Sequence, residues 1–186
     1  MWITPRHQYS DFSYPLTIDD KITIFVARIR GWQLDIADQC IRKIEHSGFA
    51  VLHIVFSYFE MISKYKDGYT ATSKSEYYFK QGIRYVFPQL NTQPSDAVNI
   101  LLHLLYTGCR CGLYHIGLTD PRIIIDSRTV KSLDFNLKSS TIIINPKSLI
   151  KALRNNLQCY EIELRNNNNT VLRQNFEKRF DFDSMT

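Results

Sequence analysis

The sequence predicts a mainly α-helical protein: a bundle of four to five helices with a small β-hairpin inserted after the fourth helical segment. Three observations support this prediction. Apolar residues recur at helical spacing through most of residues 17–118, short runs rich in β-branched residues follow in 119–145, and a helical pattern returns at 146. The length of 186 residues favours one domain built from a helical core (17–118), a flap (119–145) and C-terminal helices (146–186).

The helical segments have recognisable starts and stops. The four expected core helices span residues 17–44, 47–68, 75–87 and 95–118. Thr17 and Asp20 form a variant of the capping box at the start of the first helix. The second helix is apolar on almost all of its faces, which is typical of a central helix in a bundle. It ends near Gly68. Pro88 ends the third helix, and Gly117 marks the end of the fourth.

The pattern changes in the last third of the chain. The runs "RIIID", "VKSLDFNL" and "STIIIN" predict short strands, arranged as a hairpin or a three-stranded flap. Asn145 as N-cap and Pro146 in the first turn restart a helix. The segment "CYEIEL", residues 159–164, fits either a continuation of that helix or a strand, and residues 170–180 predict a last amphipathic helix.

Composition and charge limit the classes of function. The net charge of +5 and the pI near 9 favour an anionic partner, but only mildly. The uncharged apolar runs reach about a dozen residues, too short to cross a bilayer, so we expect a cytoplasmic protein with no membrane contact. The four cysteines are scattered and the five histidines lack metal-ligand spacing, so we expect neither a metal site nor a cofactor.

Two otherwise apolar helices each carry one lone charge. Arg110 is the only formally charged residue from Ala97 to Leu118, and Glu60 is the only one from His46 to Ser63. Because an unpaired charge is costly in apolar surroundings, we expect these two residues to pair across the bundle.

Further polar residues accompany both charges. His53, Ser57 and Lys64 share a helical stripe with Glu60, and His103 shares one with Arg110. Tyr114 follows Arg110 by one turn and could stack on a nucleobase or on the guanidinium. Such stripes are often solvated faces, but these helices are so apolar elsewhere that a polar cleft or a subunit interface explains them better.

The residues Arg110-Cys-Gly-Leu-Tyr-His115 fit an Arg-x4–6-His motif placed late in an apolar helix. In this feature the chain resembles the HEPN superfamily (higher eukaryotes and prokaryotes nucleotide-binding domains), over residues 17–118. On a regular helix a separation of five residues places the two side chains about 140° apart. They therefore converge only if the helix is irregular near Gly112 and Gly117, or across a two-fold axis.

The resemblance implies a homodimeric, metal-independent RNA endonuclease of the toxin–antitoxin or phage-defence type, with a cognate antitoxin protein as a further partner. Arg110 and His115 would be catalytic, and we expect Glu60, His103 and Tyr114 to support them. The alternative is an inactive dimeric module that binds a protein or a nucleotide. Cys111 stands where many members have Asn or Asp, which favours this alternative.

Overall fold

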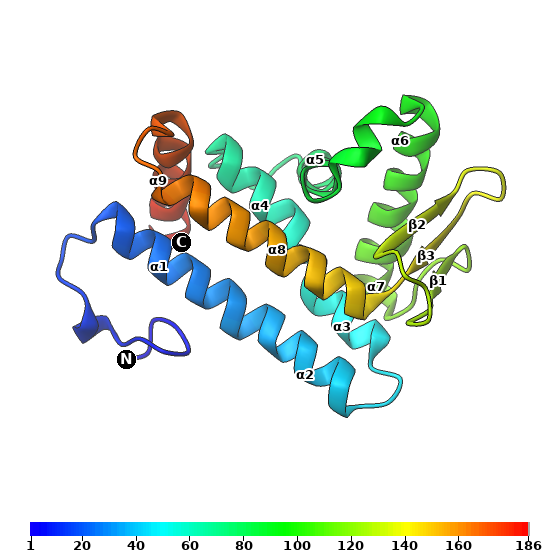
Figure 1. The fold of residues 1–186 in the computed structure, drawn as a ribbon, viewed down its shortest axis with the longest axis horizontal. Helices are drawn as coiled ribbons and strands as arrows, with labels where there is room; N and C mark the ends of the chain where they lie inside the picture. The colour runs from blue at the N-terminus through cyan, green and yellow to red at the C-terminus, as the bar shows by residue number, and fades with distance from the viewer. Residues whose placement is uncertain (186) are drawn as a thin grey trace.

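Two long helical segments, α1 to α2 and α8, lie side by side along the molecule. The computed structural model describes residues 1–185. Figure 1 shows the first segment, from α1 to α2, running along α8. The helices of the chain are α1 (Ile18–Arg28), α2 (Asp35–Lys43), α3 (Gly48–Val55), α4 (Ser57–Asp67), α5 (Ser75–Val86), α6 (Ser95–Leu104), α7 (Gly112–Ile116), α8 (Pro146–Arg165) and α9 (Thr170–Met185). Short 3-10 turns lie at Tyr9–Asp11 and Pro88–Thr92. The mainly helical fold confirms the predicted class.

Two of the predicted helices contain a π-helical segment. Residues Ile29–Leu34 (η2) join α1 to α2, and residues Leu105–Cys111 (η4) join α6 to α7. A third irregularity divides the predicted helix 47–68 at Phe56, between α3 and α4. Periodicity does not reveal such local changes of helical winding, since the apolar stripe continues through them.

The expected caps are present. The Thr17 hydroxyl accepts a hydrogen bond from the Asp20 amide at 3.2 Å, and the Asp20 carboxylate accepts one from the Thr17 amide at 3.0 Å. The Asn145 side chain accepts a hydrogen bond from the Ser148 amide at 3.0 Å at the start of α8. α8 then continues to Arg165, so residues 159–164 are helical. Its buried face, which includes Leu153, Leu157 and Tyr160, runs through the core.

A small three-stranded sheet follows α7. The predicted hairpin is the antiparallel pair β2 (Leu133–Asn136) and β3 (Thr141–Ile144), and β1 (Ile123–Ile125) pairs with β3 in parallel, which gives the order β1-β3-β2. Figure 1 shows this sheet beside α6 and α7, away from α9. Within residues 1–185, none of the helices combines the length and the apolar character needed to span a membrane.

The C-terminal helix α9 packs across the ends of α1 and α4. Phe176 of α9 contacts Phe25 of α1 and Tyr65 of α4, with ring centroids 5.5 and 5.6 Å apart. The Asn175 amide also donates a hydrogen bond to the Lys66 carbonyl at 2.9 Å, next to Gly68, which ends α4 with a φ of 63°. These contacts determine how α9 is rotated about its axis and therefore which of its side chains face α4.

Helices α4 and α5 approach each other so closely that backbone meets backbone. The Ser63 hydroxyl of α4 donates a hydrogen bond to the Tyr78 carbonyl of α5. A Cβ atom at Gly82 of α5 would lie 1.8 Å from the Phe59 carbonyl oxygen. Only glycine fits there, and its absence of a side chain sets the spacing of the two helices.

Replacing Gly82 with alanine should therefore destabilise the fold by about 3 kcal/mol, because the added methyl forces α5 away from α4. Urea unfolding followed by circular dichroism measures the change. Gln81→Ala, on the exposed face of the same turn, is the matched control and should change stability by less than about 0.5 kcal/mol. A Gly82→Ala protein as stable as the control would contradict this packing.

Candidate functional site: a cationic pocket at Arg110

Glycines position the segment that carries Arg110. The turn after α7 folds back along the helix, and the Gly108 carbonyl accepts a hydrogen bond from the Asp120 amide at 2.8 Å. A Cβ atom at Gly108 would lie 2.7 Å from the Asp120 Cβ, and one at Gly112 would lie 2.5 Å from the Leu118 carbonyl oxygen. Gly117, with a φ of 70°, ends the helix where it was expected to end. The glycines around Arg110 are therefore packing positions.

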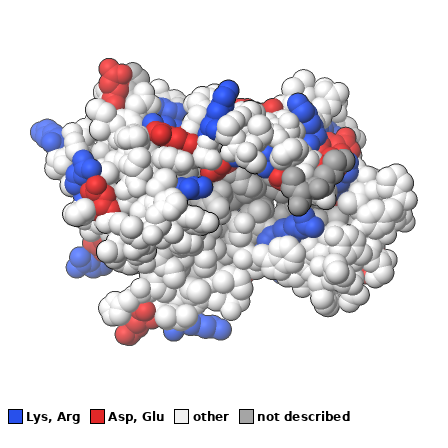
Figure 2. Space-filling model, turned by 180° about the vertical axis from the view of Figure 1, so that it is seen from behind, with Lys and Arg blue, Asp and Glu red and all other residues white. Residues whose placement is uncertain are grey.

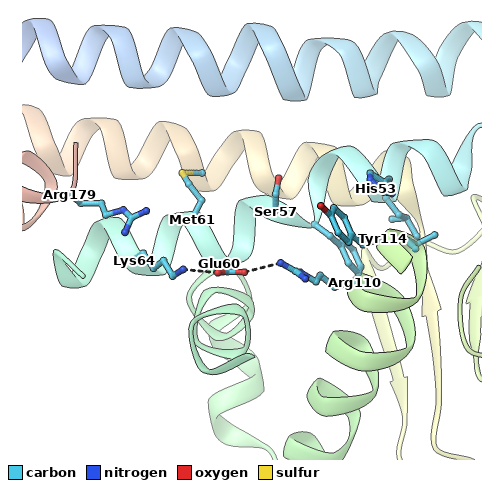
Figure 3. Close-up of a pocket in the computed structure, with 11 residues that line it drawn as sticks. His53, Ser57, Glu60, Met61, Lys64, Arg110, Tyr114 and Arg179 are labelled. Carbon is cyan, nitrogen blue, oxygen red and sulfur yellow. Dashed lines mark hydrogen bonds and ion pairs between the residues drawn. The ribbon is translucent and has the colours of Figure 1, made fainter. Parts of the chain in front are cut away.

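Arg110 points into a cavity of about 370 Å³ between α3, α4 and α7 (Figure 3). Its floor is apolar and includes the buried Leu52, Phe56 and Leu113. Its polar lining consists of His53, Ser57, Glu60, Lys64, Arg110, Tyr114 and Arg179. The expected stripe on α3 and α4 thus faces a pocket, and its four members lie together.

The Arg110 guanidinium is held from three sides. Its Nη2 lies 3.5 Å from Oε2 of Glu60, which confirms the expected ion pair. Its Cζ lies 5.6 Å from the ring centroid of Tyr106 and 5.8 Å from that of Tyr114, within range of cation–π attraction. The Arg110 side chain is 32% exposed. Among the described residues Glu60 is its one hydrogen-bond acceptor, which leaves four of its five N–H groups available.

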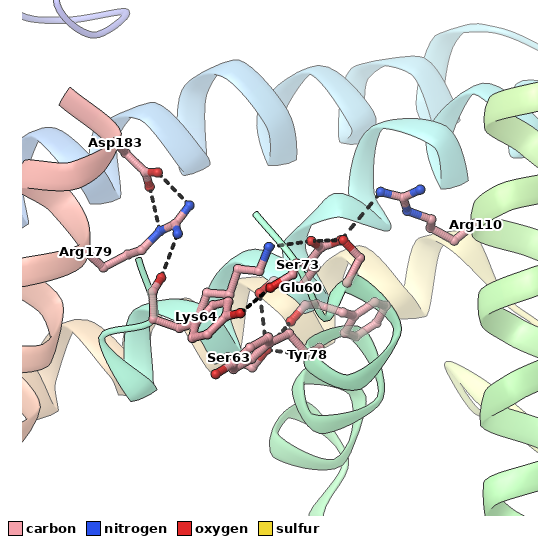
Figure 4. A network of polar contacts seen from close by, with 11 residues as sticks. Glu60, Ser63, Lys64, Ser73, Tyr78, Arg110, Arg179 and Asp183 are labelled. Atoms are coloured by element: carbon pink, nitrogen blue, oxygen red, sulfur yellow. Dashed lines mark hydrogen bonds and ion pairs between the residues drawn. The ribbon is translucent and has the colours of Figure 1, made fainter. Parts of the chain in front are cut away.

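Glu60 is bound more tightly by other groups (Figure 4). Its Oε1 accepts hydrogen bonds from Lys64 at 2.6 Å and from Ser75 at 2.8 Å. Burial acts to raise the pKa of Glu60, but these two hydrogen bonds and the charges of Lys64 and Arg110 outweigh it, and the pKa is lowered. The carboxylate therefore stays ionised at neutral pH and fixes both cations.

Two of the three histidines named from the sequence, His103 and His115, lie outside this pocket, whereas His53 lines it. His115 is exposed at the end of α7 and contacts the edge of Tyr114, with ring centroids 5.1 Å apart. His103 forms a hydrogen bond with Glu76 of α5 at 2.7 Å and contributes no side chain to the pocket lining, so its expected support of Arg110 stays a prediction. His115 is not among the described residues that line the pocket, so the Arg110 and His115 side chains do not share it within one chain.

Two residues of the site were not predicted from the sequence. Ser75 lies at the start of α5, and Arg179 lies on α9, far along the chain from Arg110. The local pattern around Arg179 is that of an ordinary amphipathic helix, so only the packing of α9 on α4 reveals its place. His53 was one of the expected stripe, and its ring stacks on Tyr114 with centroids 6.0 Å apart.

The face seen from behind Figure 1 carries charges of both signs. On the face shown in Figure 2, Lys and Arg side chains are interspersed with Asp and Glu around a hollow. In residues 1–185, no group of three or more His, Cys, Asp or Glu side chains is placed to hold a metal ion.

Comparison of the chain with protein-family models, with curated proteins and with solved structures finds no match. Function is therefore inferred from the residues and their geometry.

Replacing Glu60 with glutamine should destabilise the protein by about 2 kcal/mol at pH 7, because it leaves the nearly buried Lys64 without its anionic partner. Since folding lowers the pKa of Glu60, its contribution is present above the ordinary value of 4.5 and disappears as the pH falls through the folded-state value. The stability difference between wild type and Glu60→Gln should therefore shrink below about pH 4.5.

Thermal or urea unfolding at pH 7 and at pH 3.5 measures this difference. Glu76→Gln is the matched control, because the Glu76 carboxylate also pairs with a lysine one turn later but is 39% exposed. Its effect should stay below about 1 kcal/mol, as for most surface pairs. A pH-independent difference for Glu60→Gln would contradict the assigned network.

Proposed function

We propose that the chain is a metal-independent RNA endonuclease of the HEPN type, active as a homodimer. The observation that carries the proposal is Arg110, a partly buried guanidinium in a cationic pocket with most of its N–H groups available. Arginine holds two oxygens of a phosphate at once, and partial burial of the guanidinium strengthens that interaction. The chemistry supports a phosphodiester as the ligand of Arg110.

The surface around His115 supports a dimer. Tyr114, Ile116 and Leu118 are 68, 72 and 60% exposed, so His115 is surrounded in sequence by apolar side chains that face solvent in the monomer. Exposed apolar side chains gathered at one end are typical of a contact surface. A two-fold axis through this end would place His115 of each subunit near Arg110 of the other, which resolves the separation within one chain.

The proposed reaction needs two proton transfers and charge stabilisation. One histidine removes the proton of the 2′-hydroxyl, whose oxygen attacks phosphorus, while the second histidine protonates the departing 5′-oxygen. The products are a 2′,3′-cyclic phosphate and a 5′-hydroxyl end. Arg110 would bind the phosphoryl oxygens, where charge builds up during the attack.

A second function remains: an inactive dimeric module of the same type that binds a protein or a nucleotide. The exposed position of His115, outside the pocket, favours it. A toxin–antitoxin or phage-defence role, with a cognate antitoxin protein as partner, belongs to the nuclease proposal and requires that the free enzyme be harmful to its host cell.

His115→Ala should abolish cleavage of single-stranded RNA without a change in stability, because His115 is exposed and transfers protons rather than packing the core. Arg110→Gln should also abolish cleavage. Cleavage by the wild type should persist in EDTA, yield 2′,3′-cyclic phosphate ends and spare DNA, which lacks the attacking hydroxyl. Gel assays with end-labelled RNA measure all of these outcomes.

His46→Asn is a suitable control, since His46 is an exposed histidine in the turn before α3, and asparagine tolerates its φ of 58°. It should retain full activity. Wild-type protein that cuts no RNA would favour the binding module, and cleavage that survives His115→Ala would show that another residue transfers the proton.

The dimer has its own test. Ile116→Glu should convert a dimer into a monomer, because it places a charge among the exposed apolar side chains at the end of α7. Light scattering at micromolar concentration measures the mass, and circular dichroism should show an unchanged fold. Ile100→Glu, at a residue 62% exposed on α6, is the matched control and should remain dimeric. A monomeric wild type would contradict the proposal.

A further inference from the structure

Two more cations line the pocket next to Arg110, and both are nearly buried. The side chains of Lys64 and Arg179 are 8 and 13% exposed. Figure 3 shows Arg110 entering the pocket from η4 and Arg179 entering from α9, with Glu60 and Lys64 of α4 between them. The pocket therefore offers cations at both ends, and the second end is built from a helix outside the region that resembles the HEPN superfamily.

Arg179 is held in place by two acceptors. Its Nε and Nη2 donate hydrogen bonds to the Asp183 carboxylate at 3.1 and 2.6 Å, and its Nη1 donates one to the Tyr69 carbonyl at 2.6 Å. Asp183 is not among the residues that line the pocket. This leaves two of the five N–H groups of Arg179 without an acceptor among the described residues.

The charges of the cluster do not balance. Lys64, Arg110 and Arg179 supply three positive charges, and Glu60 and Asp183 supply two negative ones, which leaves one positive charge. Because Lys64 shares Glu60 with the partly exposed Arg110, one positive charge of this cluster is left for an anion or for solvent to compensate. An anion in the pocket, between Lys64 and Arg179, would supply that compensation.

We propose that Lys64 and Arg179 bind a second phosphate of the same RNA strand, adjacent to the phosphate bound by Arg110. This inference rests on the proposed nuclease function for the identity of the strand. Glu60 and Lys64 are four residues apart, about 6 Å along the axis of α4. Since Glu60 pairs with Lys64 on one side and with Arg110 on the other, the two groups of cations lie on either side of one carboxylate, close enough for two phosphates of one strand. Met61, which Figure 3 shows between Arg179 and Arg110, offers an apolar contact to the intervening nucleotide.

The test uses diuridylates with a 2′-O-methyl group, which cannot be cleaved through the 2′-hydroxyl. One has only its internal phosphate, and the others carry an additional phosphate at the 5′ or the 3′ end. Isothermal titration at low salt should show at least about tenfold tighter binding for one of the two phosphorylated forms. Arg179→Gln should remove this preference and leave the affinity for the unphosphorylated form unchanged, whereas Arg179→Lys should retain part of it.

Lys178→Gln is the matched control, because it removes the same charge from an exposed position on α9 and should keep the preference. Circular dichroism shows whether each variant folds. If Arg179→Gln does not fold, Arg179→Lys tests the subsite in its place. Equal affinities of the wild type for all diuridylates, no binding of any, or a preference that survives Arg179→Gln would overturn the proposal. Displacement of the terminal phosphate by millimolar inorganic phosphate would assign the subsite to free phosphate instead.

Cleavage assays separate this proposal from the nuclease function. A phosphate preference in a protein that cuts no RNA would leave the subsite standing and remove the nuclease. Cleavage of RNA by a protein that does not prefer the diuridylates with a terminal phosphate would support the nuclease function and remove the second phosphate site.

Discussion

The Glu60 carboxylate is the interaction on which the pocket depends. It lies between Lys64 and Arg110 and accepts hydrogen bonds from three side chains, one of them from the start of α5. Without it, two cations would face each other across a low-dielectric space, and each would turn toward solvent. The carboxylate thus keeps positive charge inside the molecule, at a place where an anionic ligand can reach it.

The core makes this arrangement possible by fixing the elements that carry the cations. Gly82 sets α5 against α4, which places Ser75 beside Glu60. The aromatic contacts of Phe176 hold α9 across α4, and this brings Arg179 to the far end of the pocket. The apolar packing of helices that are distant in sequence therefore decides which charges meet, while the charges themselves add little to the choice of fold.

The sequence predicts the local elements well and the long-range ones poorly. Helical periodicity, the Thr17 cap and the glycine stops locate the helices, because these signals arise within a few residues. The π-helical segment that contains Arg110 and the parallel pairing of β1 with β3 have no such local signal. The pair of Glu60 and Arg110 could be predicted because each is a lone charge in an apolar helix, whereas Arg179 could not, since it is one of several charged residues on α9.

The unequal bonds of Glu60 explain how the pocket could accept an anion without disturbing the fold. Its two short bonds, to Lys64 and Ser75, are made by Oε1, whereas the contact with Arg110 is 3.5 Å long. A phosphate that draws Arg110 away would leave the carboxylate still bound by two donors, so the loss is small. The guanidinium, in turn, is already partly desolvated and oriented by Tyr106 and Tyr114, and it needs little rearrangement to bind a ligand. Arg110 is therefore held firmly enough to be positioned and loosely enough to exchange its partner, a combination that a fully buried salt bridge would not allow.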